Sequence, residues 1–192
     1  TIYSCAKKSD TSSTTATNTE IEGTWQTPCH SQSSNWPGSS GYYRLNKLTV
    51  SGTNWTDTTE YHTDSSCATD LDTWETTYIS LALGDKLTFA TYGSSGGTGR
   101  KFTMTLSANT YTPLTSTGVS WDNTNSWCVI TGWELNTPQS IAGKTQGDST
   151  WWSKGTSAYG KYTLDGSELF FCVSMNDYPS SSCLPTTGWF KQ

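Results

Sequence analysis

A two-residue alternation of apolar and polar side chains recurs along the chain in short segments, and it constrains the fold more than any other feature. Phe102, Met104 and Leu106, for example, alternate with polar residues. Successive side chains of a β-strand point to opposite faces, so this pattern predicts strands with one buried face. Asp165-Gly166, between two such segments, has the residues of a two-residue hairpin turn. The sequence therefore predicts antiparallel strands joined by tight turns.

About eight to ten short strands at regular spacing predict an all-β fold, either an antiparallel up-and-down β-barrel or a barrel-like sandwich. The Ser/Thr-rich start of the chain differs, because it lacks the apolar periodicity that a core requires. We therefore expect a low-complexity N-terminal tail, 1–22, and a single domain, 23–192. Residues 138–150 fit either a short helix or a long loop. The segments predicted as strands are 24–30, 42–50, 55–62, 74–83, 86–92, 100–108, 127–135, 159–164 and 167–175.

The composition is typical of an exported β-protein. Charged residues make up 14% of the chain, against roughly 25% in an average soluble domain. Thr, Trp and Tyr, which suit the pleated surface of a sheet, are abundant. The net charge is -5 without a basic cluster, so we expect no nucleic-acid partner. No apolar run approaches the roughly 20 residues that span a bilayer as a helix. We expect an extracellular or cell-surface protein.

The six cysteines predict disulfide bonds formed in an oxidising compartment. The sequence has no Cys-x-x-Cys pair and only two histidines, so we expect neither a metal site nor a cofactor. Two pairings are favoured, because their members lie at the edges of strand-like segments beside Ser-rich turns. These pairs are Cys29–Cys67 and Cys172–Cys183, which leaves Cys5 and Cys128.

Gly23-Thr24-Trp25, a Gly-x-Trp at the start of the first strand after a polar tail, resembles the opening of lipocalin-like (calycin) barrels. Tyr162 to Phe171, followed by Trp189-Phe190-Lys191, resembles the closing hairpin of small exported bacterial β-barrel lipoproteins. The resemblance covers 23–192 in the order of elements. It implies a barrel with Trp25 in a structural role at one end. The biotin-binding pattern of avidin is not reproduced.

Ile2-Tyr3-Ser4-Cys5 is similar to a lipobox, the signal for lipid attachment to a cysteine. On that interpretation Cys5 is the lipidated N-terminus, and it anchors the protein to a membrane, as in an outer-membrane lipoprotein. The alternatives are a Cys5–Cys128 disulfide within one chain or between two chains. The sequence leaves all three open.

The sequence predicts a protein without enzymatic activity, because no catalytic group of residues is recognisable. Glu60, followed by a tyrosine, resembles the glutamate motif of jelly-roll xylanases, but the sequence gives no reason to choose Glu60 and Glu134 as a catalytic pair, and we interpret both as solvated strand positions. His30 and His62 have no Gly-x-Ser-x-Gly nucleophile to serve as a base. The acidic stretch 64–72 does not have the spacing of a calcium loop, and we interpret it as a polar hairpin.

The ten tryptophans are the most unusual feature. Trp25, Trp74, Trp127 and Trp133 fit core positions, whereas six others lie near turns or in polar strands. Exposed tryptophans stack on sugars, line cavities or become buried in a partner. The candidate binding or interface aromatics are Trp36, Trp55, Trp121, Trp151, Trp152 and Trp189.

Trp151 and Trp152 are adjacent, so on a strand one of them would face away from the core. The leading functional hypothesis is a self-associating structural subunit whose tail and aromatic surface contact neighbouring subunits. The first alternative is a lipocalin-like surface lipoprotein that carries a small apolar ligand. The second is a carbohydrate-binding module that recognises a glycan.

Overall fold

The structure is a computed structural model of the chain, and it describes residues 20–31, 42–89, 97–179 and 188–192. Almost all of its regular elements are strands. They are β1 (Gly23–Gln26), β2 (His30–Ser31), β3 (Tyr43–Ser51), β4 (Asn54–His62), β5 (Asp70–Phe89), β6 (Gly97–Pro113), α1 (Ser116–Thr124), the 3-10 helix η1 (Trp127–Val129), β7 (Gln139–Ser140), β8 (Thr145–Gln146), β9 (Ser149–Thr150), β10 (Ser157–Asp165), β11 (Glu168–Ser174) and β12 (Trp189–Lys191).

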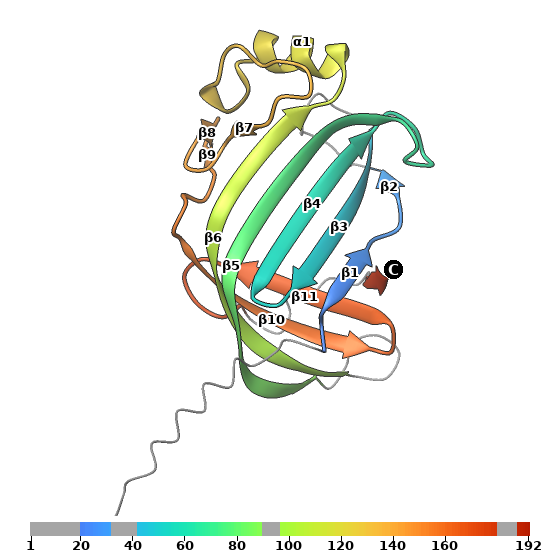
Figure 1. The fold of residues 1–192 in the computed structure, drawn as a ribbon, viewed down its shortest axis with the longest axis vertical. Helices are drawn as coiled ribbons and strands as arrows, with labels where there is room; N and C mark the ends of the chain where they lie inside the picture. Colours follow the sequence, from blue (N-terminus) through green and yellow to red (C-terminus); the bar gives the residue numbers. More distant parts are fainter. Residues whose placement is uncertain (1–19, 32–41, 90–96, 180–187) are drawn as a thin grey trace, which may run out of the picture.

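Eight antiparallel strands form a closed barrel (Figure 1). Their order around the barrel, β1-β3-β4-β5-β6-β10-β11-β12, is also their order in the sequence, and β12 pairs back with β1. Closure gives each of the eight strands a barrel neighbour on both sides, which reduces the free sheet edge that antiparallel β-proteins otherwise have to protect. The predicted all-β, up-and-down barrel is confirmed. Within the described residues, no helix has the length and hydropathy to cross a membrane.

Predicted strand 74–83 and residues 86–89 of predicted strand 86–92 belong to the single long strand β5, which continues through Gly84 and Asp85, while residues 90–92 lie outside the described part of the chain. The register between β5 and β6 shifts at three places, between Thr77 and Tyr78, between Ile79 and Ala82, and between Leu83 and Lys86. Such bulges bend a strand without ending it. A continuous β5 can therefore curve along the whole barrel, as Figure 1 shows.

Residues 127–135, also predicted as a strand, belong instead to a cap between β6 and β10. The cap begins with α1 and continues through η1, and it lies over one end of the barrel (Figure 1). Cys128 and Val129 adopt left-handed backbone angles, which lie outside the extended region of a regular strand. Trp127 and Trp133 have the even spacing of one strand face without forming a strand. Both indoles are buried where the cap packs on the barrel, each 2% exposed. Residues 138–150 form three two-residue strands and turns.

Residues 20–22, which the predicted boundary assigns to the tail, pack against the barrel. Ile21 is fully buried, and its carbonyl oxygen accepts a hydrogen bond from Trp25 Nε1 at 2.9 Å. Glu20 Oε1 accepts hydrogen bonds at 2.6 Å from Tyr162 Oη and from Arg100 Nε. Residues 20–22 are thus part of the barrel, and Trp25 has the structural role that the resemblance implies. The remainder of the predicted tail, 1–19, lies outside the described residues.

The barrel interior contains two separate apolar clusters. The first lies around Trp25, Trp55 and Phe102, at the end away from the cap. The second includes Tyr61 and Tyr111 and lies beneath the cap. The region between them is lined by members of both clusters, and it contains the candidate site.

Gly99 of β6 provides a test of the register that closes the barrel. It pairs with Thr163 of β10, and a Cβ atom at Gly99 would overlap the carbonyl oxygen of Tyr162. We expect Gly99→Ala to lower the free energy of unfolding by about 3 kcal/mol, because the backbone must move. Gly84→Ala is the matched control in β5, where the nearest contact of a new Cβ is an ordinary 3.5 Å. Urea unfolding of both variants measures the difference, and equal losses would contradict the register.

Candidate functional site

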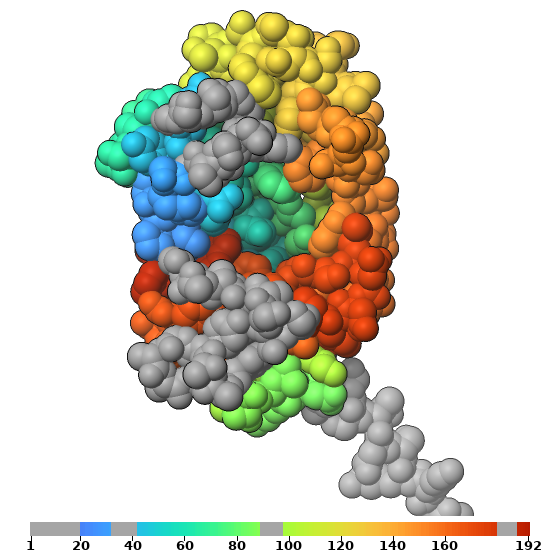
Figure 2. Space-filling view, turned by 180° about the vertical axis from the view of Figure 1, so that it is seen from behind, coloured from blue at the N-terminus to red at the C-terminus, as the bar shows by residue number. Residues whose placement is uncertain are grey.

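A cavity of about 270 Å³ opens inside the barrel between the two apolar clusters. Figure 2 shows this hollow from behind, with the teal and green atoms of β4 and β5 at its floor and orange residues before β10 along one side. Four aromatic rings and a carboxyl group are among its walls. The lining residues are Asp57, Trp74, Thr76, Tyr78, Leu106, Asn109, Trp151 and Trp152.

The cavity exists because β6 changes partners along its length. Its pairing with β10 covers the residues up to Thr105, and beyond this point β6 pairs with the short strand β7 at Thr110 and Tyr111. The barrel wall is therefore not continuous near the cap. The chain segment that returns from the cap to β10 lies there and contributes Trp151 and Trp152 to the cavity.

The floor of the cavity follows from strand alternation. Asp57 of β4 pairs with Thr76 of β5, which pairs in turn with Asn109 of β6. The Oδ1 atom of Asn109 accepts hydrogen bonds from Trp74 Nε1 at 2.5 Å and from Thr76 Oγ1 at 3.4 Å. These bonds fix the orientation of the Trp74 indole in the wall.

Trp151 and Trp152 both face the cavity. The rings of Trp74 and Trp151 lie 4.6 Å apart with an interplanar angle of 71°, and those of Tyr78 and Trp152 lie 6.4 Å apart at 72°. Trp151 Nε1 donates a hydrogen bond to Cys128 Sγ at 3.1 Å. The prediction that one of the two tryptophans points away from the core is wrong, because this segment is not a strand.

Asp57 carries the charge of the cavity wall. Its Oδ1 atom is shielded from solvent and has no hydrogen-bond partner in the described part of the chain. Burial raises the pKa of Asp57 from its ordinary 3.8 to about 7, against the opposing influence of the Arg44 guanidinium. A carboxylate removed from water without a donor is unfavourable, so burial favours the protonated form of Asp57.

Two further buried acids, Asp72 and Asp122, lie where the cap meets the barrel. Asp72 of β5 is 2% exposed and Asp122 of α1 is fully buried. Burial raises the pKa of Asp72 to about 6, and burial together with the charge of Asp72 raises the pKa of Asp122 to about 8. Gly118 allows α1 to pack closely against β5, because a Cβ atom at this position would overlap Asp72 Oδ1. Among the described residues, no three His, Cys, Asp or Glu side chains gather as a metal site.

The structure divides the six tryptophans predicted to bind or to form interfaces. Trp151 and Trp152 line the cavity, and Trp36 lies outside the described residues. Trp55 and Trp189 are core residues, 1% and 8% exposed, so for these two the prediction of a contact surface is wrong. Trp55 stacks on Phe102 at 5.1 Å.

The sixth candidate, Trp121, packs against the cluster beneath the cap. Its ring lies 5.9 Å from that of Trp127, and its side chain is partly buried.

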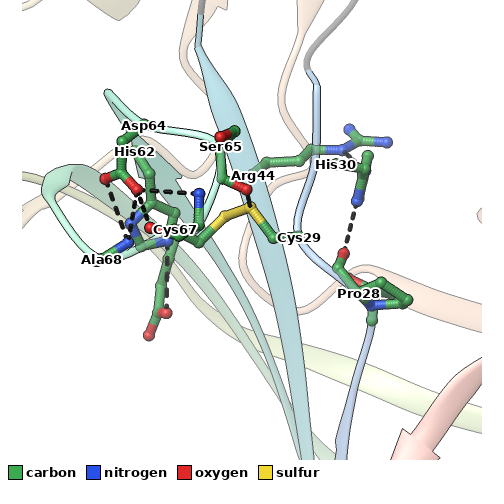
Figure 3. Close-up of a disulfide and its surroundings, with 12 residues drawn as sticks. Pro28, Cys29, His30, Arg44, His62, Asp64, Ser65, Cys67 and Ala68 are labelled. Carbon is green, nitrogen blue, oxygen red and sulfur yellow. Dashed lines mark hydrogen bonds and ion pairs between the residues drawn. A yellow bond between two sulfur atoms is a disulfide. The ribbon is translucent and has the colours of Figure 1, made fainter.

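The predicted Cys29–Cys67 disulfide is confirmed (Figure 3). It joins the segment before β2 to the turn after β4, with Cα atoms 5.9 Å apart. Cys172 is disulfide-bonded as well, while its predicted partner Cys183 lies outside the described residues. A disulfide at Cys128 is contradicted, because this thiol is free and fully buried against Trp151. Cys5 lies outside the described residues.

Residues 64–69 of the acidic stretch form the polar turn that the sequence predicts, and β5 begins at Asp70. Asp64 accepts hydrogen bonds from the Ser66 hydroxyl and from the backbone N–H groups of Ser66, Ala68 and Thr69, and the hydroxyl bond first, then the backbone bonds, lower its pKa (Figure 3). Asp72 differs from the predicted polar hairpin, because it lies in β5 and is buried.

Glu60 forms an ion pair with Lys47 at 2.6 Å. Its supposed catalytic partner, Glu134, lies in the exposed cap loop.

Sequence reasoning missed Asp57 and Tyr78 as site residues. A signal was present, because Asp57 lies on the same face of β4 as the buried residues Trp55 and Tyr61. An acid in the middle of an inward-facing row indicates a polar group inside a barrel.

No protein-family model matches this chain, and no curated protein matches it either.

Proposed function

We propose that this chain is a non-enzymatic binding protein that holds one small organic molecule in the cavity of its barrel. The single observation that carries the proposal is the aromatic cavity itself. Protein interiors are close-packed and leave few voids larger than a water molecule. A hollow of about 270 Å³ walled by three indoles and a phenol is the usual form of a ligand site.

The lining gives the ligand its general chemistry. Trp74, Trp151 and Trp152 offer flat apolar surfaces on which a ring or a short hydrocarbon can pack. Asp57, Thr76 and Asn109 add a few polar groups on one side, which would orient the bound molecule. Binding inside a closed barrel is also what the lipocalin-like resemblance implies.

The Cys29–Cys67 disulfide supports a proposal for the place of binding. The Cys29–Cys67 bond is compatible with an exported protein, so we propose binding outside the cell or at its surface. Self-association through the tail, lipid attachment at Cys5 and glycan recognition stay predictions. Two of the aromatic residues on which surface contacts depended, Trp55 and Trp189, are buried in the core.

The test uses N-phenyl-1-naphthylamine, a neutral probe whose emission rises in apolar surroundings. We expect saturable binding to the wild-type protein and about five- to tenfold weaker binding to Trp152→Ala, because one aromatic wall is lost. Trp121→Ala is the matched control, since this partly buried indole of α1 packs against the cluster beneath the cap and does not line the cavity. A fluorescence titration measures all three proteins.

Circular dichroism has to show that both variants keep the barrel. The proposal fails if the wild-type protein does not bind the probe, or if the two tryptophan variants lose the same affinity.

A further inference from the structure

We infer that the ligand is a protonated amine, whose ammonium group binds the carboxylate of Asp57 and whose apolar body packs among Trp74, Trp151 and Trp152. This inference rests on the proposed function and names the ligand class of the same cavity. It is carried by one acid placed among four aromatic rings.

Asp57 needs a donor that the described residues do not supply. Oδ1 of Asp57 is shielded from solvent and lacks a hydrogen-bond partner there. An ionised carboxylate only accepts hydrogen bonds, and its burial without a donor or a counter-ion is costly. An ammonium group provides both the donor and the opposite charge, so its binding removes this cost.

The aromatic walls suit a cation as well as a hydrocarbon. The face of an indole carries partial negative charge and attracts an ammonium group within about 6 Å. Trp74 and Trp151 meet at 71°, and Tyr78 and Trp152 at 72°. Rings inclined in this way present a face on one side and an edge on the other, so a small cation can touch faces from more than one direction.

The other groups near Asp57 do not take the place of the ligand as its hydrogen-bonded counter-ion. Arg44 of β3 influences the carboxyl electrostatically, but the described structure contains no ion pair between them, and Arg44 Nε donates to His30 Nε2 at 2.6 Å. Tyr78 of β5 has its pKa raised by burial and stays neutral. Asn109 and Leu106 of β6 and the two tryptophans carry no charge. The net charge of the chain, -5, also favours approach of cations.

Three probes with the same phenyl body separate the ligand classes. They are 2-phenylethylamine, 2-phenylethanol and 3-phenylpropanoate, which are cationic, neutral and anionic. Calorimetric titration at about pH 8 should show the amine binding roughly 10- to 100-fold more tightly than the alcohol, the range of a charge-assisted hydrogen bond. The anion should bind most weakly, because Asp57 repels it.

Asp57→Asn removes the charge and keeps the size of the side chain. We expect it to weaken amine binding about 10- to 100-fold and to leave alcohol binding unchanged. Glu60→Gln is the matched control on the same strand, since Glu60 pairs with Lys47 and is not part of the cavity wall. It should change neither affinity.

Proton release is a readout that a merely structural Asp57 would not produce. Because the carboxyl of the empty site has a raised pKa of about 7, amine binding at about pH 6 should expel its proton. The measured heat would then depend on the buffer, and affinity should rise between about pH 6 and about pH 8. Asp57→Asn should abolish both effects.

The probe experiments separate a failure of the amine assignment from a failure of the proposed binding function. If the alcohol and the neutral naphthylamine bind but the amine has no advantage, or if Asp57→Asn leaves amine binding intact, the amine assignment is overturned and the binding function stands. Tightest binding of 3-phenylpropanoate would overturn it in the same way. If none of the probes binds, both are overturned.

Discussion

Raising the pH from about 5 to about 9 should lower the free energy of unfolding by several kcal/mol, on the order of 5. Three buried carboxyl groups produce this effect, because burial raises the pKa of each. The values are about 6 for Asp72, about 7 for Asp57 and about 8 for Asp122. Asp122 is also raised by the neighbouring charge of Asp72.

The direction follows from proton binding by the two states. In the unfolded chain these acids have their ordinary pKa of 3.8, so above that value the unfolded state has released protons that the folded state still holds. Stability then falls as the pH rises. The fall ends near pH 6 for Asp72, near pH 7 for Asp57 and near pH 8 for Asp122. Asp64, whose pKa is lowered, acts below this range.

Asp122→Asn isolates the largest of these contributions. The amide cannot ionise, so the variant should lose less stability between about pH 5 and about pH 9 and should exceed the wild-type protein at the upper end. Asp148→Asn, at an exposed position beside β9, is the control and should follow the wild-type profile. Urea unfolding across the pH series measures the three curves. A wild-type stability that rises toward about pH 9 contradicts the prediction, as does an Asp122→Asn curve parallel to it.

The barrel was predictable because its strands are half-buried and therefore alternate. The same rule failed at residues 127–135, where Trp127 and Trp133 are buried by a cap of irregular backbone. Two buried side chains at an even spacing satisfy a two-residue period whether or not the chain between them is extended. The rule also missed the continuity of β5, because its bulges interrupt the alternation as a turn would.

The candidate site was predictable only in part. Trp151 and Trp152 were identified as unusual, but their shared orientation depends on a segment that does not follow strand geometry. Asp57 and Asn109 come together across three strands, and that juxtaposition depends on register. The cavity itself arises where β6 exchanges β10 for β7. Alternation reveals which residues point inward, but it does not reveal which inward residues lack a packing partner.

Removal of the Cys29–Cys67 disulfide should cost about 4 kcal/mol of unfolding free energy. The bond joins residues separated by 38 positions, and closing a loop of that length reduces the entropy of the unfolded chain by this amount. The folded turn should persist without the bond, because Asp64 still accepts its backbone hydrogen bonds. The loss therefore belongs to the unfolded state, and probe binding to the folded protein should not change.

The double variant Cys29→Ser/Cys67→Ser tests this better than a reducing agent, because Cys172 is disulfide-bonded too and a reductant would break that bond as well. Cys128→Ser is the comparison: its thiol is free, so it closes no loop, and any loss there reflects the buried contact with Trp151. Urea unfolding should show a lower midpoint for the double variant, with naphthylamine affinity retained. A loss below about 1 kcal/mol would mean that the two segments already associate in the unfolded chain. A loss of probe affinity would instead mean that the disulfide shapes the cavity, although no cysteine lines it.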